Sequence, residues 1–361
     1  MSDPNAITAY ETREGGPPAG FPSQSQSSKL RWAVKNPPSD PQTSFSDKTV
    51  LVTGANTGLG FEAAVKYATH NAERIILAVR STAKGENTKA RIVQRTGYNS
   101  ASITILTVDL SSFDSVQAFA TALFKSTDKL DIALLNAGLG NPTYEKSPTG
   151  WEMALQVNVL STALMAVLIL PLLGATATAR GTSTHLTFVN SNGHDLSKRE
   201  WLDDSGSLLK TCNDQKGWVP ERSYSLVKLM GMAIMQAVAR AAATATAPSG
   251  QSGTSPLVIV NAVCPGLCKT DLGRNFGLGS KIAGFVFLAA FARSAEQGAR
   301  SLVSATALGP ESHGRLWHHD VLYPIGEMAR DEELMKRTWG EIWAVISEGQ
   351  PELEKALNNG G

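Results

Sequence analysis

The sequence lacks most features of secreted and metal-binding proteins. Only three of its 361 residues are cysteine, too few and too scattered for a disulfide framework, so we expect reduced thiols. Cys264 and Cys268 have no His or Cys cluster that would complete four ligands, and no metal is predicted. The N-terminus has no basic segment followed by an apolar one, which argues against a signal peptide and favours a cytoplasmic protein.

Excess charge and long apolar runs are missing too. The 33 basic and 32 acidic residues leave a net charge of +1, which gives no indication of a nucleic-acid partner. The apolar runs Ala163–Leu173 and Ile282–Ala292 are shorter than the roughly 18 residues of a membrane span. We expect no transmembrane segment. The first run is interpreted as a buried helix, and the second as either an interfacial segment or an apolar substrate lid over 276–293.

What the sequence does contain is a long alternation of apolar runs and amphipathic segments after residue 45. Residues 1–44, rich in Pro, Gly, Ser and Gln, are predicted to be a flexible extension with little regular structure. Residues 45–361 are predicted to form a single α/β domain: a doubly wound, mainly parallel sheet of about seven strands with helices on both faces. The expected strands are Val50–Thr53, Arg74–Val79, Ile103–Val108, Ile132–Leu135, Leu186–Asn190 and Val258–Val263.

A glycine-rich loop joins the first expected strand to the first helix. In this loop Gly54 permits a sharp turn, Gly58 lets backbone approach a ligand, and Gly60 lets helix and sheet pack closely. Free N–H groups at the helix start then face a diphosphate, as in a Rossmann dinucleotide site. The loop residues expected to bind the cofactor are Gly54, Asn56, Thr57, Gly58, Leu59 and Gly60.

The end of the second strand indicates which dinucleotide is bound. NAD-specific sites usually place an acid there, whereas this chain has Arg80 and Ser81, with Lys84 one turn later. A guanidinium suits a 2′-phosphate in charge and geometry. NADP(H) is therefore predicted, the alternative being an ordinary surface arginine.

Two further strand ends carry candidate cofactor residues. Asp109 and Leu110 follow the third strand, where a carboxylate could meet the adenine or could cap the next helix. Asn136, Ala137 and Gly138 follow the fourth strand as a small-residue passage beside the expected cofactor.

Tyr224 and Lys228 lie four residues apart at the start of a helical segment, on one face. A tyrosine with a pKa of about 10 needs a stabilised phenolate to act in acid–base catalysis, and a neighbouring ammonium supplies that. Alone, the pair could be an ordinary surface contact. Its position after a dinucleotide loop and an apolar strand ending in Ser191 favours catalysis.

Together these motifs resemble the short-chain dehydrogenase/reductase family from about Lys48 to Trp343. The layout is similar to the retinol-dehydrogenase-like branch and to fungal reductases of polyketides and other natural products. The resemblance implies that Pro265, Gly266 and Thr270 lie near the nicotinamide and that Asn158 holds a relay water. The catalytic residues it implies are Asn158, Ser191, Tyr224 and Lys228.

One departure concerns the substrate mouth. Ser191 lies 33 residues before Tyr224, and the resulting insertion 194–222 is expected to form a loop over the mouth. His318 and His319 suggest a metal site, but adjacent histidines point apart in regular structure, so polar residues at a strand end are the preferred interpretation.

The resemblance implies reversible, NADP(H)-dependent reduction of a carbonyl group on an apolar or aromatic small molecule. The protein is expected to be a monomer or a homodimer. Two alternatives stay open. One is a non-redox isomerase, dehydratase or cyclase built on the same scaffold; the other is a catalytically silent NADP(H)-sensing regulator.

Overall fold

The computed structural model describes residues 20–22, 26–202, 205–244, 257–269 and 291–358. Thr270 and most of the expected 276–293 lid lie outside the described residues.

One eight-stranded sheet organises the chain, in the order β3-β2-β1-β4-β5-β6-β7-β8. All neighbours pair in parallel except β7 and β8, which form an antiparallel hairpin. This hairpin is why the sheet exceeds the seven strands expected. The strands are β1 (Thr49–Thr53), β2 (Arg74–Val79), β3 (Ile103–Thr107), β4 (Ile132–Leu135), β5 (Thr184–Val189), β6 (Val258–Cys264), β7 (Leu316–His318) and β8 (Val321–Tyr323).

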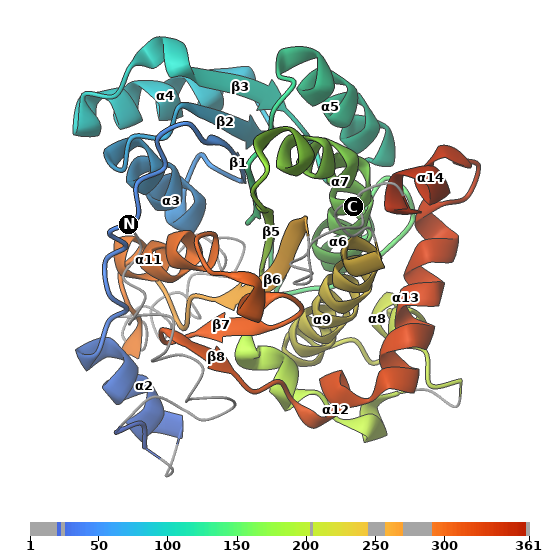
Figure 1. Ribbon diagram of the computed structural model, residues 1–361. Helices are drawn as coiled ribbons and strands as arrows, with labels where there is room; N and C mark the ends of the chain where they lie inside the picture. Colours follow the sequence, from blue (N-terminus) through green and yellow to red (C-terminus); the bar gives the residue numbers. More distant parts are fainter. Residues whose placement is uncertain (1–19, 23–25, 203–204, 245–256, 270–290, 359–361) are drawn as a thin grey trace.

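Helices cover both faces of the sheet (Figure 1). On one face lie α3 (Gly58–Thr69), α4 (Thr82–Thr96) and α11 (Ala295–Ala305). On the other lie α5 (Phe113–Ser126), α7 (Ser161–Arg180) and α9 (Pro220–Thr244). Because both faces are covered, β1 is buried at all five positions, which explains its continuous apolar run. The predicted doubly wound fold is confirmed.

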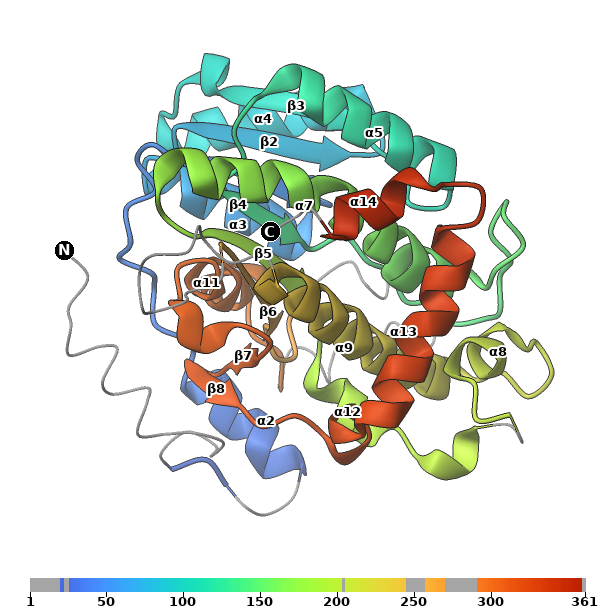
Figure 2. The same ribbon diagram turned by 45° about the vertical axis from the view of Figure 1, so that its right-hand side comes forward.

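C-terminal helices form an outer layer on α7 and α9 (Figure 2). They are α12 (Glu327–Arg330), α13 (Glu332–Ile346) and α14 (Glu352–Asn358). Two stretches, Met153–Arg180 and Pro220–Ala243, are long and apolar enough to cross a membrane, but 78% and 67% of their most apolar windows are buried inside the fold. Here they serve as core helices, as predicted for Ala163–Leu173.

Two sequence-based expectations need correction. The extension 1–44 is not without regular structure, because Gln26–Lys35 form helix α2. The insertion 194–222 is not one loop over the mouth: it contains short helices, and α8 packs against α9 and α13. Further short helical segments in the described residues are η1 (Ser100–Ser102), α6 (Met153–Leu155), η2 (Gln156–Leu160), η3 (Asn192–Leu196), η4 (Arg199–Trp201), α8 (Leu208–Asn213) and η6 (Pro310–Ser312).

Candidate active site

A cavity of about 1330 Å³ gathers most of the sequence-predicted site residues. Gly60 and Ser81 do not line it, although each adjoins a segment that does. The predicted residues that line it are Gly54, Asn56, Thr57, Gly58, Leu59, Arg80, Lys84, Asp109, Leu110, Asn136, Ala137, Gly138, Asn158, Ser191, Tyr224, Lys228, Pro265 and Gly266.

The glycine loop is held against the end of β4. Gly54 and Gly58 have positive φ values of 66° and 55°, which favour glycine. A methyl group at Gly60 would lie 2.5 Å from both the Asn136 side chain and the Gly54 carbonyl, so only glycine fits without a shift. Asn136 Nδ2 in turn donates to the Thr53 carbonyl at 2.9 Å. Thr57 begins α3 without a side-chain cap, which leaves the first N–H groups of the helix available to an anion.

At the other end of the cavity, Arg80 and Lys84 are exposed cations beside the end of β2. Asp109 Oδ1 accepts hydrogen bonds from the Ser111 N–H and hydroxyl at 2.9 and 2.8 Å. It does not cap α5, because Ser112 does. This corner therefore presents two cations and a fixed carboxylate to the cavity.

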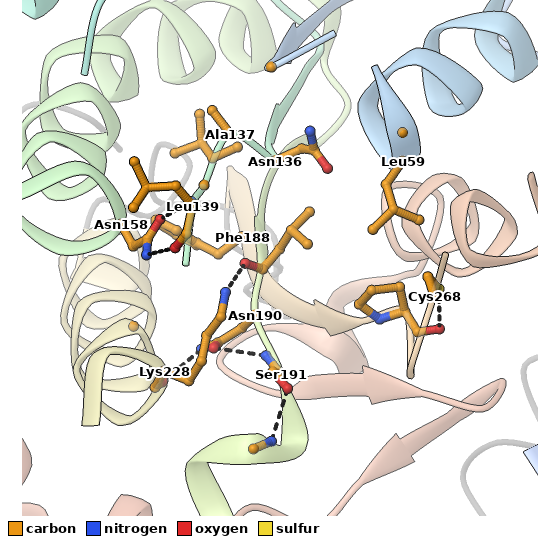
Figure 3. A pocket seen from close by; sticks show the side chains of 18 of the residues that line it. Leu59, Asn136, Ala137, Leu139, Asn158, Phe188, Asn190, Ser191, Lys228 and Cys268 are labelled. Carbon is orange, nitrogen blue, oxygen red and sulfur yellow. Dashed lines mark hydrogen bonds between the residues drawn. The ribbon is translucent and has the colours of Figure 1, made fainter. Parts of the chain in front are cut away.

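Asn158 lies in η2, a π-helical turn between α6 and α7. Such insertions are frequent at functional sites because they re-aim one side chain out of a helix. Its amide pairs with the Leu139 backbone: Nδ2 donates to the carbonyl at 2.8 Å and Oδ1 accepts from the N–H at 2.9 Å (Figure 3). The amide thus fixes the chain just after the Asn136–Gly138 passage.

Ser191 and Tyr224 form the centre of the site. Ser191 begins η3 and its Oγ accepts from the Gly193 N–H at 3.0 Å. Burial raises the pKa of Tyr224 to about 12, and a hydrogen bond with the Ser191 side chain opposes that rise. A methyl group at Gly193 would lie 3.0 Å from Tyr224 Cε1, so the glycine permits this close packing.

Lys228 lies behind Tyr224 on α9. Its Nζ is 5.8 Å from the centroid of the Tyr224 ring and donates to the Val189 carbonyl at 3.4 Å. Burial lowers the pKa of Lys228 to about 8. Lys228 is not among the groups that shift the Tyr224 pKa, so the expected lowering by this ammonium is not seen; burial is the largest effect and raises that pKa. Tyr224 is therefore a protonated donor in this state.

The β7–β8 turn corrects the sequence-based view of the histidine pair. His319 and Asp320 have positive φ values of 51° and 57°, so the turn is not regular structure and the rings of His318 and His319 lie 3.8 Å apart. Within the described residues, no group of three or more potential ligands surrounds them. His318 instead faces Cys264: burial opposes ionisation of the thiol, but His318 together with backbone hydrogen bonds from Asn192 and Gly266 lowers the Cys264 pKa to about 6.

Several lining residues escaped sequence analysis. Phe21, Lys29, Leu30 and Ala33 come from the N-terminal arm, defined as the described residues 20–22 and 26–44 before β1. Among the described residues of the insertion 194–222, Asp195 and Leu196 line the cavity.

Comparisons with known proteins identify the family. The family model described as short chain dehydrogenase matches residues 48–193. The short-chain dehydrogenase/reductase ffsI of Aspergillus flavipes is 42% identical over 340 residues, covering 93% of this chain and 97% of its own length. The chain belongs to the short-chain dehydrogenase/reductase family. A second relative, the short-chain dehydrogenase/reductase phmF of Phaeosphaeria nodorum, is 39% identical with the same coverage of both chains.

Solved structures of this short-chain dehydrogenase/reductase fold are more distant. A protein of unknown function from Caenorhabditis elegans, solved with cofactor, has a TM-score of 0.57 at 18% identity and covers 80% of this chain and 99% of its own. An NADP complex of Pseudomonas aeruginosa RhlG has a TM-score of 0.54 at 20% identity, covering 76% and 95%. At these identities they support the fold.

Proposed function

We propose that this short-chain dehydrogenase/reductase is an NADP(H)-dependent oxidoreductase that reduces a carbonyl, or oxidises the matching alcohol, of an apolar or aromatic small molecule. The observation that carries the proposal is the hydrogen-bonded pair of Ser191 and Tyr224 in the cavity wall, with Lys228 behind it. We place the reaction in fungal secondary metabolism and in the cytoplasm, within a catalytic domain over 45–361.

The residues present fit a nicotinamide dinucleotide. The contacts of Gly60 leave no space for a side chain at the glycine loop, and the start of α3 offers uncapped N–H groups to a diphosphate. Arg80 and Lys84 supply positive charge for a 2′-phosphate, which favours NADP(H) over NAD(H). Among the related folds, three structures contain NADP or NADPH and another contains NADH, so the preference rests on this chain's own cations. When bound, the nicotinamide would supply or accept the hydride.

The chain's own side chains handle the proton. Burial raises the pKa of Tyr224 to about 12, so the tyrosine carries a proton that Oη can donate to the carbonyl oxygen of the substrate. The Ser191 hydroxyl holds that same oxygen by a hydrogen bond. The Lys228 ammonium stabilises the phenolate that donation leaves, and Asn158 is proposed to hold a water that returns a proton through Lys228.

Apolar residues shape the substrate end of the cavity. Leu139 and Tyr323 line it, and Leu196 is 56% exposed although it is a large aliphatic side chain. Exposed apolar surface beside a catalytic pair is typical of a binding site for an apolar ligand.

The test is Tyr224→Phe, which removes the phenolic proton and little else. With a panel of carbonyl compounds as substrates, we expect the rate of NADPH oxidation to fall by about a thousandfold, a typical contribution of general-acid catalysis. NADPH binding should stay near normal. Wild-type conversion of substrate without stoichiometric NADPH consumption would instead identify a non-redox enzyme. Tight NADPH binding with no turnover of any panel member would identify a silent sensor.

A further inference from the structure

We propose that helix α2 of the N-terminal arm is part of the cofactor site, and that Lys29 binds the diphosphate that NADP(H) and NAD(H) share. This rests on the proposed function, since it requires a nicotinamide dinucleotide in the large cavity. Phe21, Lys29, Leu30 and Ala33 line that cavity together with the glycine loop. The arm is thus a wall of the site.

Arg293 fixes α2 in place. Its side chain is buried, with a relative exposure of 1%. Nε donates to the Ala33 carbonyl at 2.9 Å and Nη2 to the Asn36 carbonyl at 3.0 Å, both at the C-terminal end of α2. Carbonyls there have no partner within the helix, so a guanidinium is a suitable cap.

The same guanidinium reaches the turn beside the expected nicotinamide. Nη1 donates to the Pro265 carbonyl at 3.4 Å, and Nη2 lies 2.7 Å from His319 Nδ1. The Arg293 backbone pairs with Leu267 and Lys269, so the turn is held by both backbone and side chain. A buried charge that lost its acceptors on α2 would be costly, which makes the arm and the turn one unit.

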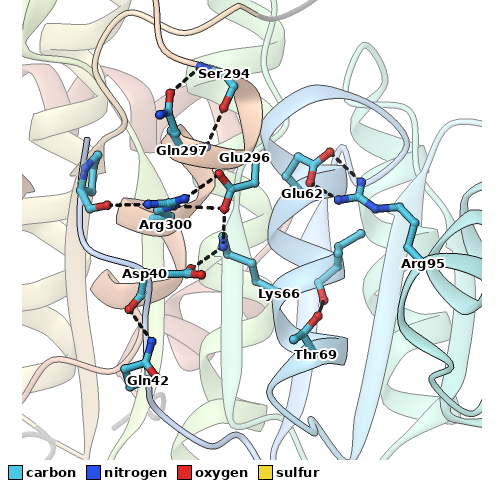
Figure 4. Close-up of polar contacts among 12 residues, drawn as sticks. Asp40, Gln42, Glu62, Lys66, Thr69, Arg95, Ser294, Glu296, Gln297 and Arg300 are labelled. Carbon is cyan, nitrogen blue, oxygen red and sulfur yellow. Dashed lines mark hydrogen bonds and ion pairs between the residues drawn. The ribbon is translucent and has the colours of Figure 1, made fainter. Parts of the chain in front are cut away.

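An ion-pair network fastens the arm further along (Figure 4). Lys66 on α3 lies between Asp40 of the arm at 2.5 Å and Glu296 of α11 at 2.7 Å. Arg300 binds Glu296 and also donates to the Pro38 carbonyl at 3.3 Å. The Lys66 side chain is 8% exposed, whereas Asp40 and Glu296 are 47% and 36% exposed, so solvent screens these contacts in part.

The position of the arm is the reason we assign Lys29 to the diphosphate and not to the 2′-phosphate. A methyl group at Gly298 of α11 would lie 2.4 Å from Cys268 Sγ and 2.6 Å from Leu59 Cδ2, so the turn that Arg293 ties to α2 and the first turn of α3 both pack against Gly298. Leu59 is where a diphosphate would meet free N–H groups. Arg80 follows β2, five places from β7 in the sheet, or about 24 Å away at the usual strand spacing.

Lys29 has the chemistry for this role. Its Nζ is 5.9 Å from the centroid of the Phe21 ring, and no carboxylate in the described part of the chain forms an ion pair with it. An ammonium that lines a cavity without an acidic partner is ready for an anionic ligand.

The experiment compares Lys29→Ala with Lys35→Ala, an exposed lysine on the same helix that does not line the cavity. Dissociation constants for NADPH and NADH are measured by fluorescence titration of the full-length protein. We expect Lys29→Ala to weaken both cofactors about tenfold, the effect of one charge-assisted contact, with the loss shrinking in high salt. Lys35→Ala leaves both constants unchanged, and Lys29→Arg restores most of the affinity.

Equal cofactor affinity of the Lys29→Ala and Lys35→Ala variants would overturn the inference. A loss of affinity confined to NADPH would also overturn it, because Lys29 would then bind the 2′-phosphate. Melting temperatures of the cofactor-free variants test whether the arm stays folded. We expect them to match that of the wild type, because Lys29 is partly exposed. If the wild-type protein binds neither cofactor, the proposed function fails instead, before any variant is compared.

Discussion

The Asn158 side chain and the Leu139 backbone satisfy one another through two hydrogen bonds of 2.8 and 2.9 Å. The pairing joins the π-helical turn to the chain after β4, and it leaves the amide one free N–H and one free lone pair for the proposed relay water. The position of the active-site wall thus depends on an amide rather than on helix propensity.

We predict that Asn158→Asp is at least as damaging as Asn158→Ala. A carboxylate still accepts from the Leu139 N–H but repels the Leu139 carbonyl, which loses its donor at a cost of about 1–3 kcal/mol. Denaturant unfolding measures this cost, and kcat should fall with it. An aspartate variant as stable as the wild type would show that the paired bonds contribute nothing.

The pH profile should report Lys228. Because burial lowers its pKa to about 8, the ammonium is present below that pH and is lost above it. We therefore expect kcat/KM for carbonyl reduction to fall above about pH 8. In Lys228→Arg the guanidinium keeps its charge, so the alkaline limb should move out of range even though the plateau is lower. A wild-type profile that is flat from pH 7 to 10 would contradict the role of the charged lysine.

Arg80 should decide cofactor choice. Arg80→Ala is expected to raise the Kd for NADPH more than about tenfold and to leave that for NADH within about twofold, since the 2′-phosphate alone is affected. Arg95→Ala is the matched control: this guanidinium, at the end of α4, pairs with Glu62 and does not line the cavity. Equal losses of affinity for NADPH and NADH in Arg80→Ala would show that Arg80 does not bind the 2′-phosphate.

Gly60→Ala should disrupt the loop through sterics. The new methyl group would meet the Gly54 carbonyl and Asn136 Nδ2 at 2.5 Å, so backbone must shift, at about 1–3 kcal/mol, and NADPH binding should weaken. Gly340→Ala on α13 is the control, because nothing lies within 4 Å of its methyl position. It should raise stability by about 0.5–1 kcal/mol. If the two variants melt alike, close packing at Gly60 is not what requires glycine.

We expect a monomer of 38.3 kDa in light scattering. Helices α13 and α14 cover α7 and α9, with Leu334, Ile342 and Leu353 buried, so these apolar helices need no second copy. Ile342→Asp should loosen this cover and produce dimers or aggregates. Lys336→Ala, on the exposed side of α13, should stay monomeric. A dimeric wild-type protein would show that another face associates.

Local patterns were enough to predict the fold class and the set of candidate site residues that the structure brings to one cavity. The glycine loop between β1 and α3, the cation after β2 and the four-residue spacing of Tyr224 and Lys228 each depend on the geometry of one turn, one strand end or one helix face. Parallel strands bring their carboxyl ends to one edge, so these local features meet in space without further information. The sequence therefore determined the fold class and the candidate catalytic residues.

Contacts between distant segments were decided by the tertiary structure alone. The arm forms a wall of the cavity because Arg293 and Lys66 hold it there. Arg293 is more than 200 residues away from its partner along the chain, and Lys66 is about 25 residues away from its partner. The raised pKa of Tyr224 depends on how deeply it is buried, and the close approach of His318 and His319 depends on a turn with positive φ. Such packing and desolvation arise from many weak long-range contacts, for which no short pattern in the sequence carries the signal.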